Sequence, residues 1–190
     1  MPEANAAALD FLKTRRSRPA KTLTAPAPER AELEALLTIA ARTPDHGKLE
    51  PWRFIVIEGD AMAKLADAAE TTAKALGFDE EKTAKARSQF DQGICAVAVV
   101  ESPVMSDKIP AIEQTYSAGA VCLALVNAAL AAGWGANWLS GAISHERQFA
   151  EHALGLTPHE RIAGLIHIAT ETATPPDRPR PDVKAKTTWL

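Results

Sequence analysis

The amino-acid sequence predicts an α+β protein in which one central sheet carries helices on both faces. Segments with strand and helix patterns are mixed along the chain without a regular β-α-β alternation, which disfavours a parallel, doubly wound sheet. Residues 94–101 are apolar almost throughout, as expected of a central strand that is covered on both faces. Residues 116–132 are apolar on nearly all sides, which predicts a helix buried between two layers.

The first part of the chain is predicted to form two helices joined by an extended connection. The first helix is expected over residues 5–15. The proline-rich residues 17–28 then favour an extended connection. The second helix is expected from Pro28, because residues 33–40 keep the spacing of a buried stripe. It ends before Pro44, since a residue that precedes proline avoids the α region.

The other elements follow in order along the chain. A strand is predicted over Trp52–Glu58. Residues 61–89 are charged and alanine-rich with a break at Gly77, which predicts two exposed helices. After the central strand and the buried helix, three segments are expected to complete the core: residues 134–139, a short helix over 146–154 and a strand over 162–169.

Length and composition predict one domain followed by an arm. A chain of 190 residues suits a single well-packed domain, which we assign to residues 1–174. Residues 175–190 are rich in proline and have few apolar side chains before Trp189 and Leu190, so they cannot form a core of their own. We expect them to form an extended C-terminal arm that packs on a partner subunit, and a disordered tail is the alternative.

Composition disfavours two classes of partner. The formal net charge is -3 and aromatic residues make up 5%, so a general nucleic-acid-binding surface is not expected. The longest apolar run, residues 118–126, is far shorter than the roughly 20 residues of a membrane span. The N-terminus lacks the pattern of a signal peptide, and Cys95 and Cys122 lie in apolar segments. We therefore expect a soluble, cytoplasmic protein.

Several common catalytic motifs are absent from the sequence. There is no G-x-S-x-G hydrolase motif, and the histidines lack the spacing of a zinc helix, so no metal site is expected. Gly133-Trp134-Gly135 is a fragment of a dinucleotide fingerprint, but it precedes a strand where the fingerprint has to open a helix. A Rossmann site is therefore not predicted.

The first of two candidate binding clusters is Arg15-Arg16-Ser17-Arg18, at the end of the first predicted helix. Cations complement the partial negative charge of a helix C-terminus, so a solvated charge run is one interpretation. Three guanidinium groups and a hydroxyl also form an anion site through bidentate hydrogen bonds, which suits phosphate in particular. The residues alone leave both interpretations open.

The second cluster is the loop RTPDHGKLEPWRF, residues 42–54. Its two prolines each fix their own φ, so the loop is stiffer than an ordinary solvated loop. Its charged or titratable residues include Arg42, Asp45, His46, Lys48 and Arg53. A rigid loop with these side chains predicts contact with a ligand. The alternative is a surface turn in which Asp45 hydrogen-bonds its own backbone.

Three motifs together resemble the nitroreductase-like flavoproteins. They are R-R-S on the first helix, R-x-P-D-H-x-x-x-x-P-W-R-F-x-V-I-E-G after the second helix, and G-x-x-W-x-S-G-A after the long apolar helix. They occur in the order of the family, and the likeness extends over about residues 7–170. The sequence resembles in particular the small, single-domain NAD(P)H nitroreductases of this family.

The resemblance implies a fold, a cofactor, an assembly and an activity. The fold is a three-layer sandwich with a mostly antiparallel central sheet. The cofactor is FMN, held without a covalent bond in a cleft shared by the two subunits of a homodimer. NADH or NADPH donates a hydride, and a small planar acceptor, nitroaromatic or quinone-like, is reduced when it binds in turn at the flavin.

The resemblance also assigns residues to the site. The expected FMN contacts are Arg15, Arg16, Ser17, Arg42, His46, Trp138, Leu139 and Ser140. The expected nicotinamide contacts are Ala128, Ala129, Leu130, Ala131, Ala132 and Gly133, for which helix packing is the alternative role. The chemistry takes place at the flavin, so no catalytic side chain is expected.

An alternative function is a flavin-binding carrier or redox sensor without turnover. Similar proteins have an arginine where this sequence has Leu139. A backbone contact with the flavin survives this change, whereas a side-chain ion pair does not. The leucine and the alanine-rich helix end are the features that favour this alternative.

Overall fold

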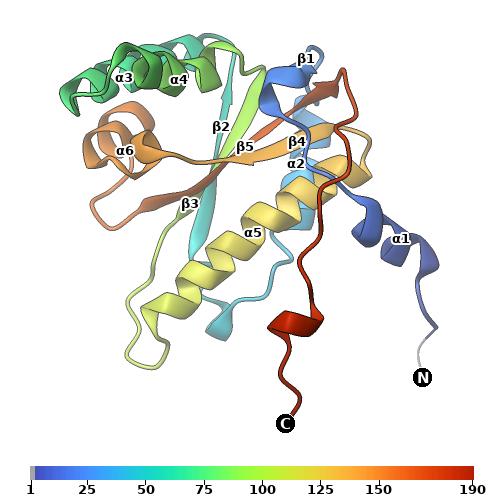
Figure 1. The fold of residues 1–190 in the computed structure, drawn as a ribbon. Coiled ribbons are helices and arrows are strands. Elements are labelled where there is room, and N and C mark those ends of the chain that lie inside the picture. The colour runs from blue at the N-terminus through green and yellow to red at the C-terminus, as the bar shows by residue number, and fades with distance from the viewer. Residues whose placement is uncertain (1–2) are drawn as a thin grey trace.

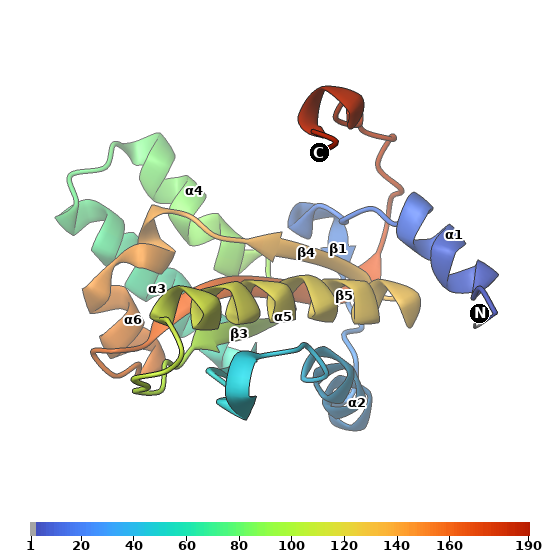
Figure 2. The same cartoon turned by 90° about the horizontal axis from the view of Figure 1, so that it is seen from below.

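The computed structural model describes residues 3–190 and has three layers (Figure 1). The strands of the middle layer are β1 (Leu23–Thr24), β2 (Trp52–Glu58), β3 (Cys95–Glu101), β4 (Gly135–Leu139) and β5 (Arg161–Glu171). The helices are α1 (Ala6–Thr14), α2 (Arg30–Ala40), α3 (Asp60–Ala75), α4 (Glu80–Asp91), α5 (Ala111–Ala131) and α6 (Arg147–Leu154). Helices α3, α4 and α6 cover one face of the sheet, and α2 and α5 cover the other (Figure 2). The predicted α+β sandwich is confirmed.

Every strand pair in the sheet is antiparallel. β3 lies between β2 and β5 and is buried at every residue, as predicted for the central strand. β4 and the two-residue β1 both pair with β5. β1 lies within the segment that was predicted to be an extended connection. A strand of two residues has no alternating pattern by which the sequence could reveal it.

The two faces of the sheet carry separate hydrophobic cores, because successive residues of a strand point to opposite faces. On one face, Ala98 of β3 belongs to a cluster with Phe90 of α4 and Phe149 of α6. On the other face, Val97 of β3 belongs to a cluster with Leu125 of α5. The sheet is therefore a rigid middle layer from which the ends of β4 and α5 are positioned.

The two helices predicted within residues 61–89 are present, but they are not simply exposed. The break at Gly77 is confirmed, and this glycine has a φ of 72°. The buried residues of α3 are Met62, Leu65, Ala66, Ala69 and Ala73. Alanine occurs both in solvated helices and on closely packed helix faces, so the alanine-rich composition did not reveal the buried side.

Helix α5 differs from the prediction in its start and in its surface. It begins at Ala111 rather than at residue 116. Three of its large side chains are exposed, Ile112 by 52%, Tyr116 by 68% and Leu123 by 47%. Together with Gly119 they have the spacing i, i+4, i+7 and i+11, which places them on one side of the helix. We call Ile112, Tyr116, Gly119 and Leu123 the α5 stripe.

Helix α5 is also the one helix within residues 3–190 that is long and apolar enough to cross a membrane. The side opposite the α5 stripe packs against the sheet through buried residues such as Val121 and Leu125. This is the arrangement of a core helix in a soluble protein, in agreement with the expected solubility.

Helix α1 and the C-terminal arm extend away from the body of the molecule (Figures 1 and 2). α1 buries none of its side chains in its own chain, and Leu9 and Leu12 are 48% and 58% exposed. The arm is exposed along almost all of residues 175–190, and Trp189 is 91% exposed. A helix this short is marginal without packing. The packing of the arm on a second subunit stays a prediction.

The side chain of His167 in β5 predicts a dependence of stability on pH. It is buried, neither ring nitrogen has a hydrogen-bond partner among residues 3–190, and burial lowers its pKa to about 4. The unfolded chain, with a histidine pKa near 6.5, binds more protons than the folded protein at lower pH. Stability is therefore lost as the pH falls from about 6.5 towards 4.

We expect this titration to lower the free energy of unfolding by about 2 kcal/mol between pH 7 and pH 5. The substitution His167→Leu removes the imidazole, so the loss in that variant is expected to be smaller by this amount. Urea unfolding of both proteins at the two pH values measures the difference. An equal loss in both proteins contradicts the assignment to His167.

Candidate functional site

The first predicted cluster lies where α1 ends and the chain turns along β4. The Arg15 guanidinium donates from Nη2 to Ser17 Oγ at 3.1 Å. The backbone N–H of Arg18 donates to the carbonyl oxygen of Ala136 at 2.8 Å. Asn137 Nδ2 in turn donates to the carbonyl oxygen of Arg18 at 2.9 Å. These bonds hold the segment after α1 beside β4.

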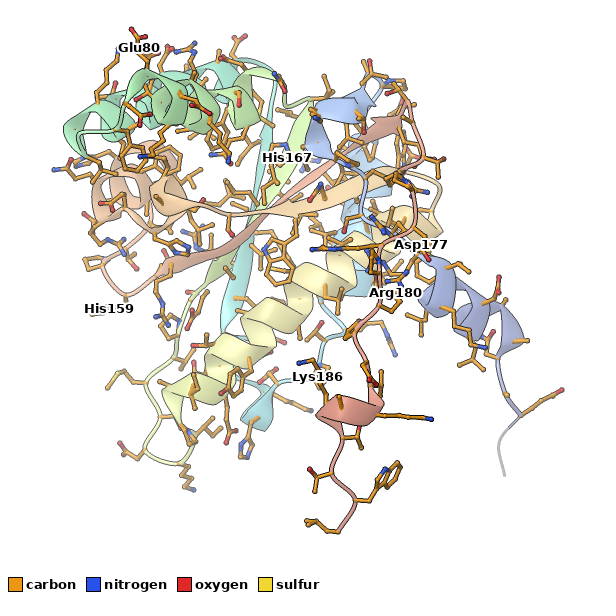
Figure 3. The ribbon with its side chains drawn as sticks, in the orientation of Figure 1. Glu80, His159, His167, Asp177, Arg180 and Lys186 are labelled. Carbon is orange, nitrogen blue, oxygen red and sulfur yellow. The ribbon has the colours of Figure 1, made fainter. Side chains whose placement is uncertain are left out.

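The C-terminal arm brings a further arginine to this cluster (Figure 3). Arg180 Nη2 donates to Asp177 Oδ1 at 3.1 Å, and the same carboxylate oxygen lies 3.6 Å from Arg16 Nη1. Burial lowers the pKa of Arg15, and the neighbouring positive charges lower it further, that of Arg180 first. We call Arg15, Arg16, Arg18 and Arg180 the arginine cluster.

The arginine cluster carries more positive charge than its carboxylates balance. Asp177 and Glu171, which pairs with Arg18, are the two acidic partners of the four guanidinium groups. Two buried nitrogens, Arg15 Nε and Arg16 Nη1, have no hydrogen-bond partner within residues 3–190. A buried donor without a partner is costly. A phosphate group has both the charge and the acceptor oxygens to satisfy this cluster.

A cavity of about 230 Å³ opens beside the arginine cluster. Two of the predicted nicotinamide contacts, Leu130 and Gly133, line it. Ala128 and Ala129 have their methyl groups in the core between α5 and the sheet, in the alternative role of helix packing. The remaining two residues of the stretch, Ala131 and Ala132, are exposed at the end of the helix.

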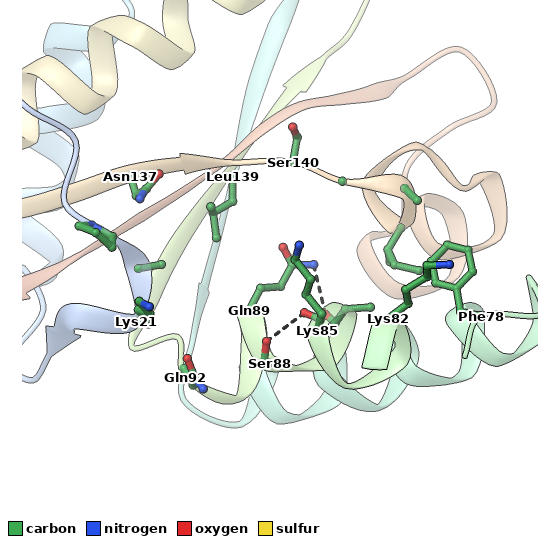
Figure 4. Close-up of a pocket in the computed structure, with 16 residues that line it drawn as sticks. Lys21, Phe78, Lys82, Lys85, Ser88, Gln89, Gln92, Asn137, Leu139 and Ser140 are labelled. Atoms are coloured by element: carbon green, nitrogen blue, oxygen red, sulfur yellow. Dashed lines mark hydrogen bonds between the residues drawn. The ribbon is translucent and has the colours of Figure 1, made fainter. Parts of the chain in front are cut away.

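The predicted W-x-S turn lies at the end of β4. Trp138 extends across Gly164 of β5, where a Cβ atom would fall 2.2 Å from Trp138 Nε1. Only a glycine leaves room for the indole in this position. Leu139 points from β4 towards α4, whereas the Ser140 hydroxyl points to the opposite side (Figure 4).

A second cavity, of about 580 Å³, lies between β4 and α4. It is bordered by Lys21 and by Leu139 and Ser140 of the W-x-S turn. The segment after α1 thus passes from the arginine cluster to this larger cavity, and β4 runs beside it for about 15 Å. An elongated ligand with an anionic end at the arginine cluster and a flat body at the W-x-S turn, beside the larger cavity, fits this arrangement.

Part of the charged loop 42–54 serves local structure. Asp45 Oδ1 accepts a hydrogen bond from the backbone N–H of Leu49 at 2.6 Å, as expected for a surface turn. Arg53 donates to both carboxylate oxygens of the buried Glu160, at 2.6 and 2.9 Å. The hydrogen bond from Arg53 is the main reason that the pKa of Glu160 is lowered to about 2. Asp45 and Arg53 of the loop therefore both have partners within the chain.

Of the remaining predicted residues of the loop, His46 lies at the opposite end of α5 from the arginine cluster. The exposed Arg42 comes two residues before Pro44, whose carbonyl oxygen accepts a hydrogen bond from Ser117 Oγ of α5 at 3.1 Å. His46 Nδ1 lies 2.7 Å from Oε2 of Glu113, in the first turn of α5. Leu130, in the last turn, lines the cavity of the arginine cluster. At 1.5 Å per residue these two levels of the helix are about 25 Å apart. One chain does not bring the two predicted clusters together.

Comparison with known proteins identifies the family. Residues 12–170 match the sequence profile of the Nitroreductase family. This chain belongs to the nitroreductase family. The protein named "Putative NAD(P)H nitroreductase YdjA" of Escherichia coli (strain K12) is 35% identical over 163 residues, which are 86% of this chain and 87% of that protein.

Solved structures of nitroreductases share the fold of this chain. The nitroreductase-like family protein from Bacillus cereus has a TM-score of 0.82 and 27% identity, and the match covers 100% of this chain and 98% of that one. The FMN-dependent nitroreductase NfnB from Mycobacterium smegmatis, solved in complex with NADPH, has a TM-score of 0.74 at 15% identity, covering 97% and 98%.

Arg180 is the residue of this nitroreductase chain that the sequence did not point to. It lies outside the matched residues 12–170 and in a proline-rich arm without a recognisable motif. Arg180 lies close to Arg15 because the arm passes the end of α1. The three recognised motifs, in contrast, all lie within the matched residues.

Proposed function

We propose that this nitroreductase is an FMN-dependent oxidoreductase that takes a hydride from NADH or NADPH and reduces a small planar acceptor, nitroaromatic or quinone-like. The arginine cluster carries this proposal, because its excess positive charge and the two nitrogens, on Arg15 and Arg16, that have no hydrogen-bond partner within residues 3–190 fit the phosphate of FMN. The name of the E. coli relative, an NAD(P)H nitroreductase, supports the donor and the acceptor class.

The residues of the chain would bind and orient the flavin, which supplies hydride acceptance and electron transfer when it is bound. Arg15, Arg16 and Ser17 would hold the phosphate together with Arg180. The turn Trp138, Leu139 and Ser140 would support the ring. Leu139 contacts it through the backbone, since its side chain is turned towards α4.

The assembly that we propose is a homodimer in which each flavin site uses both subunits. The α5 stripe is an apolar surface whose three large side chains are left about half exposed or more by the described residues 3–190. A Cβ atom placed on Gly119, in its middle, would meet no atom within 4 Å, so a second helix has room to approach. Two-fold dimers bring the same surface of both chains together. Leu9 and Leu12 of α1 are further exposed side chains that a second subunit would cover.

Antiparallel packing of two α5 stripes would place the first turn of one helix beside Leu123 of the other, two turns before the helix ends. Arg42 and His46 of the partner subunit would then approach the arginine cluster of the first subunit. This would reduce the separation along the helix axis from about 25 Å to about 12 Å. The loop 42–54 would contact the flavin bound mainly by the other subunit.

We place this dimer in the cytoplasm. Both cysteines, Cys95 and Cys122, are buried free thiols, as suits a reducing compartment.

The C-terminal arm is proposed to cross onto the partner subunit. Asp177 and Arg180 lie at the arginine cluster of their own chain, so the ten residues 181–190 remain to cross, and extended at roughly 3.1 Å per residue they would span about 30 Å. Its prolines restrict the unfolded chain, which lowers the entropy lost on docking. Trp189 is the large apolar side chain that the arm would seat on the partner.

Deletion of residues 175–190 is expected to lower dimer stability and to loosen FMN, because it removes both the arm and Arg180. Sedimentation and bound flavin at low micromolar concentration measure the two effects. Arg180→Ala in the full chain is the matched control, and it is expected to loosen FMN while the dimer persists. A truncated protein that stays dimeric and retains its flavin contradicts the proposed role of the arm.

The proposed function is tested by mixing the purified, FMN-loaded protein with NADPH without oxygen and following the flavin absorbance. Bleaching within seconds, followed by recovery when a nitroaromatic or a quinone is added, is the expected result. An oxidised spectrum that persists for minutes with NADH and with NADPH supports the carrier or sensor instead. A protein that remains colourless after incubation with FMN contradicts the flavin site.

A further inference from the structure

We propose that the cavity between α4 and β4 is the acceptor site and that it selects planar acceptors that carry an anionic group such as a carboxylate. This inference rests on the proposed function, because it places the flavin ring at the turn that borders the cavity. Leu139, Ser140 and Gly141 of that turn form one wall (Figure 4). A molecule in the cavity would therefore lie next to the ring.

The size and the apolar walls of the cavity suit a flat aromatic molecule. Its volume of about 580 Å³ is within the range of small-molecule sites, about 300–1,000 Å³. Leu139 and Ile143 line it from one side, and Phe78 and Ala86 line it from the side of α4. The ring of Phe78 and the leucine side chain offer surfaces on which an aromatic acceptor can stack.

All the charged side chains that line the cavity are positive. Lys82 and Lys85 lie three residues apart on the face of α4 that looks towards β4, and Lys21 approaches from the segment after α1 (Figure 4). None of the lining residues is an aspartate or a glutamate. Lys82 also lies 3.3 Å from Asp79, which caps α4, but Lys21 and Lys85 have no ion pair among residues 3–190.

The side of α4 that faces α3 is different. There Arg87 contacts Asp67, Glu70 and Asp91, at 2.7, 2.7 and 2.8 Å. The positive charge on that side is therefore neutralised within the protein. On the side of α4 that faces the cavity, the positive charge remains available to bind an anionic ligand.

A cleft with one sign of charge and low-dielectric walls raises the local concentration of counter-ions. Neutral donors are also present, because the amides of Gln89 and Gln92 and the hydroxyl of Ser88 line the same cavity. A carboxylate on an aromatic ring would reach the lysines while the ring lies against Leu139. A neutral acceptor of the same shape would be stabilised only by stacking.

The test compares two probes of equal shape, 4-nitrobenzoate and 4-nitrobenzamide, by calorimetric titration of the FMN-loaded protein without an electron donor. We expect the carboxylate to bind at least about tenfold more tightly than the amide, in line with charge-assisted hydrogen bonds. In the double variant Lys82→Gln, Lys85→Gln this ratio is expected to fall about tenfold. Glutamine is a good helix former, so α4 is retained.

Lys64→Gln is the matched control, because Lys64 is an exposed lysine of α3 that does not line the cavity. It is expected to keep the ratio of the wild type. Equal affinities for both probes in the wild type, or a ratio that the double variant does not change, overturns the proposal. So does a double variant in which only the affinity for NADPH falls, since the lysines would then bind the phosphates of the donor.

The flavin absorbance of each preparation is recorded before the titration. A protein that does not retain FMN contradicts the proposed function. A loaded protein without a preference for the carboxylate contradicts the acceptor site alone.

Discussion

Replacement of Leu123 by glutamate is expected to separate the dimer into subunits and to release FMN at the same time. Leu123 lies in the α5 stripe and is 47% exposed in the single chain. In a two-fold interface the substitution occurs twice, and each new carboxylate would be buried without a partner. A loss of several kcal/mol of association free energy is expected, which weakens the dimer at least about a hundredfold.

Leu76→Glu is the matched control for this substitution. Leu76 is a similarly exposed leucine, at 40%, that follows α3 and lies outside the α5 stripe. The control protein is expected to remain dimeric and yellow. Sedimentation velocity and flavin absorbance, measured over a series of protein concentrations, follow both properties together. A Leu123→Glu protein that stays dimeric and holds its flavin contradicts the proposed interface.

Arg15→Ala and Arg42→Ala are each expected to lower the affinity for FMN at least about tenfold, because a charge-assisted hydrogen bond contributes about 1.5–3 kcal/mol. Arg15 belongs to the arginine cluster, where burial and three other guanidinium groups already lower its pKa. Arg42 lies in the loop 42–54, near Pro44, which contacts Ser117 of α5, and would act on the site of the partner subunit. Two substitutions that are distant in one chain are thus expected to have the same effect.

Fluorescence titration of the flavin-free proteins with FMN measures these affinities. Arg30→Ala is the control, because the Arg30 side chain is 92% exposed and pairs with Glu34 on its own helix. Its affinity for FMN is expected to equal that of the wild type. Unchanged affinity in both Arg15→Ala and Arg42→Ala would place the anion site elsewhere.

Much of the fold could be predicted from the sequence because its strong patterns are local. The strand Trp52–Glu58 and the buried strand β3 follow from continuous apolar runs. The alanine-rich α3 was assigned as a helix, but its buried side was not found, because alanine is common on both faces of helices. The two-residue β1 was missed for another reason, since a strand this short carries no alternating pattern.

The exposed side of helix α5 could not be predicted from the sequence, for a different reason. A helix that is apolar on all sides can be covered by its own chain on all sides or by a second chain on one side. Nothing in the order of its residues distinguishes Val121, which is buried in the core, from Leu123, which is exposed. The structure of one chain was needed to find the stripe.

The candidate site was predicted only in part, because its residues come together over long distances in the sequence. The motifs placed Arg15 and Trp138 near the site, but Arg180 could be found only by following the arm. Arg53 looked like a ligand-binding residue of the loop. It is instead paired with Glu160, a partner that no local pattern connects to it.

A mixed dimer of one Arg15→Ala subunit and one Arg42→Ala subunit tests the shared flavin site most directly. Each parent dimer lacks one of the two arginines at both sites. If a site combines Arg15 of one subunit with Arg42 of the other, the mixed dimer has one complete site and one site without either arginine.

The two subunits can be given different affinity tags, so that the mixed dimer is purified and its bound FMN is titrated. We predict about one tightly bound FMN per mixed dimer, at the affinity of the wild type, where the parent dimers have none. A mixed dimer that binds FMN no better than either parent would show that each subunit builds its site alone.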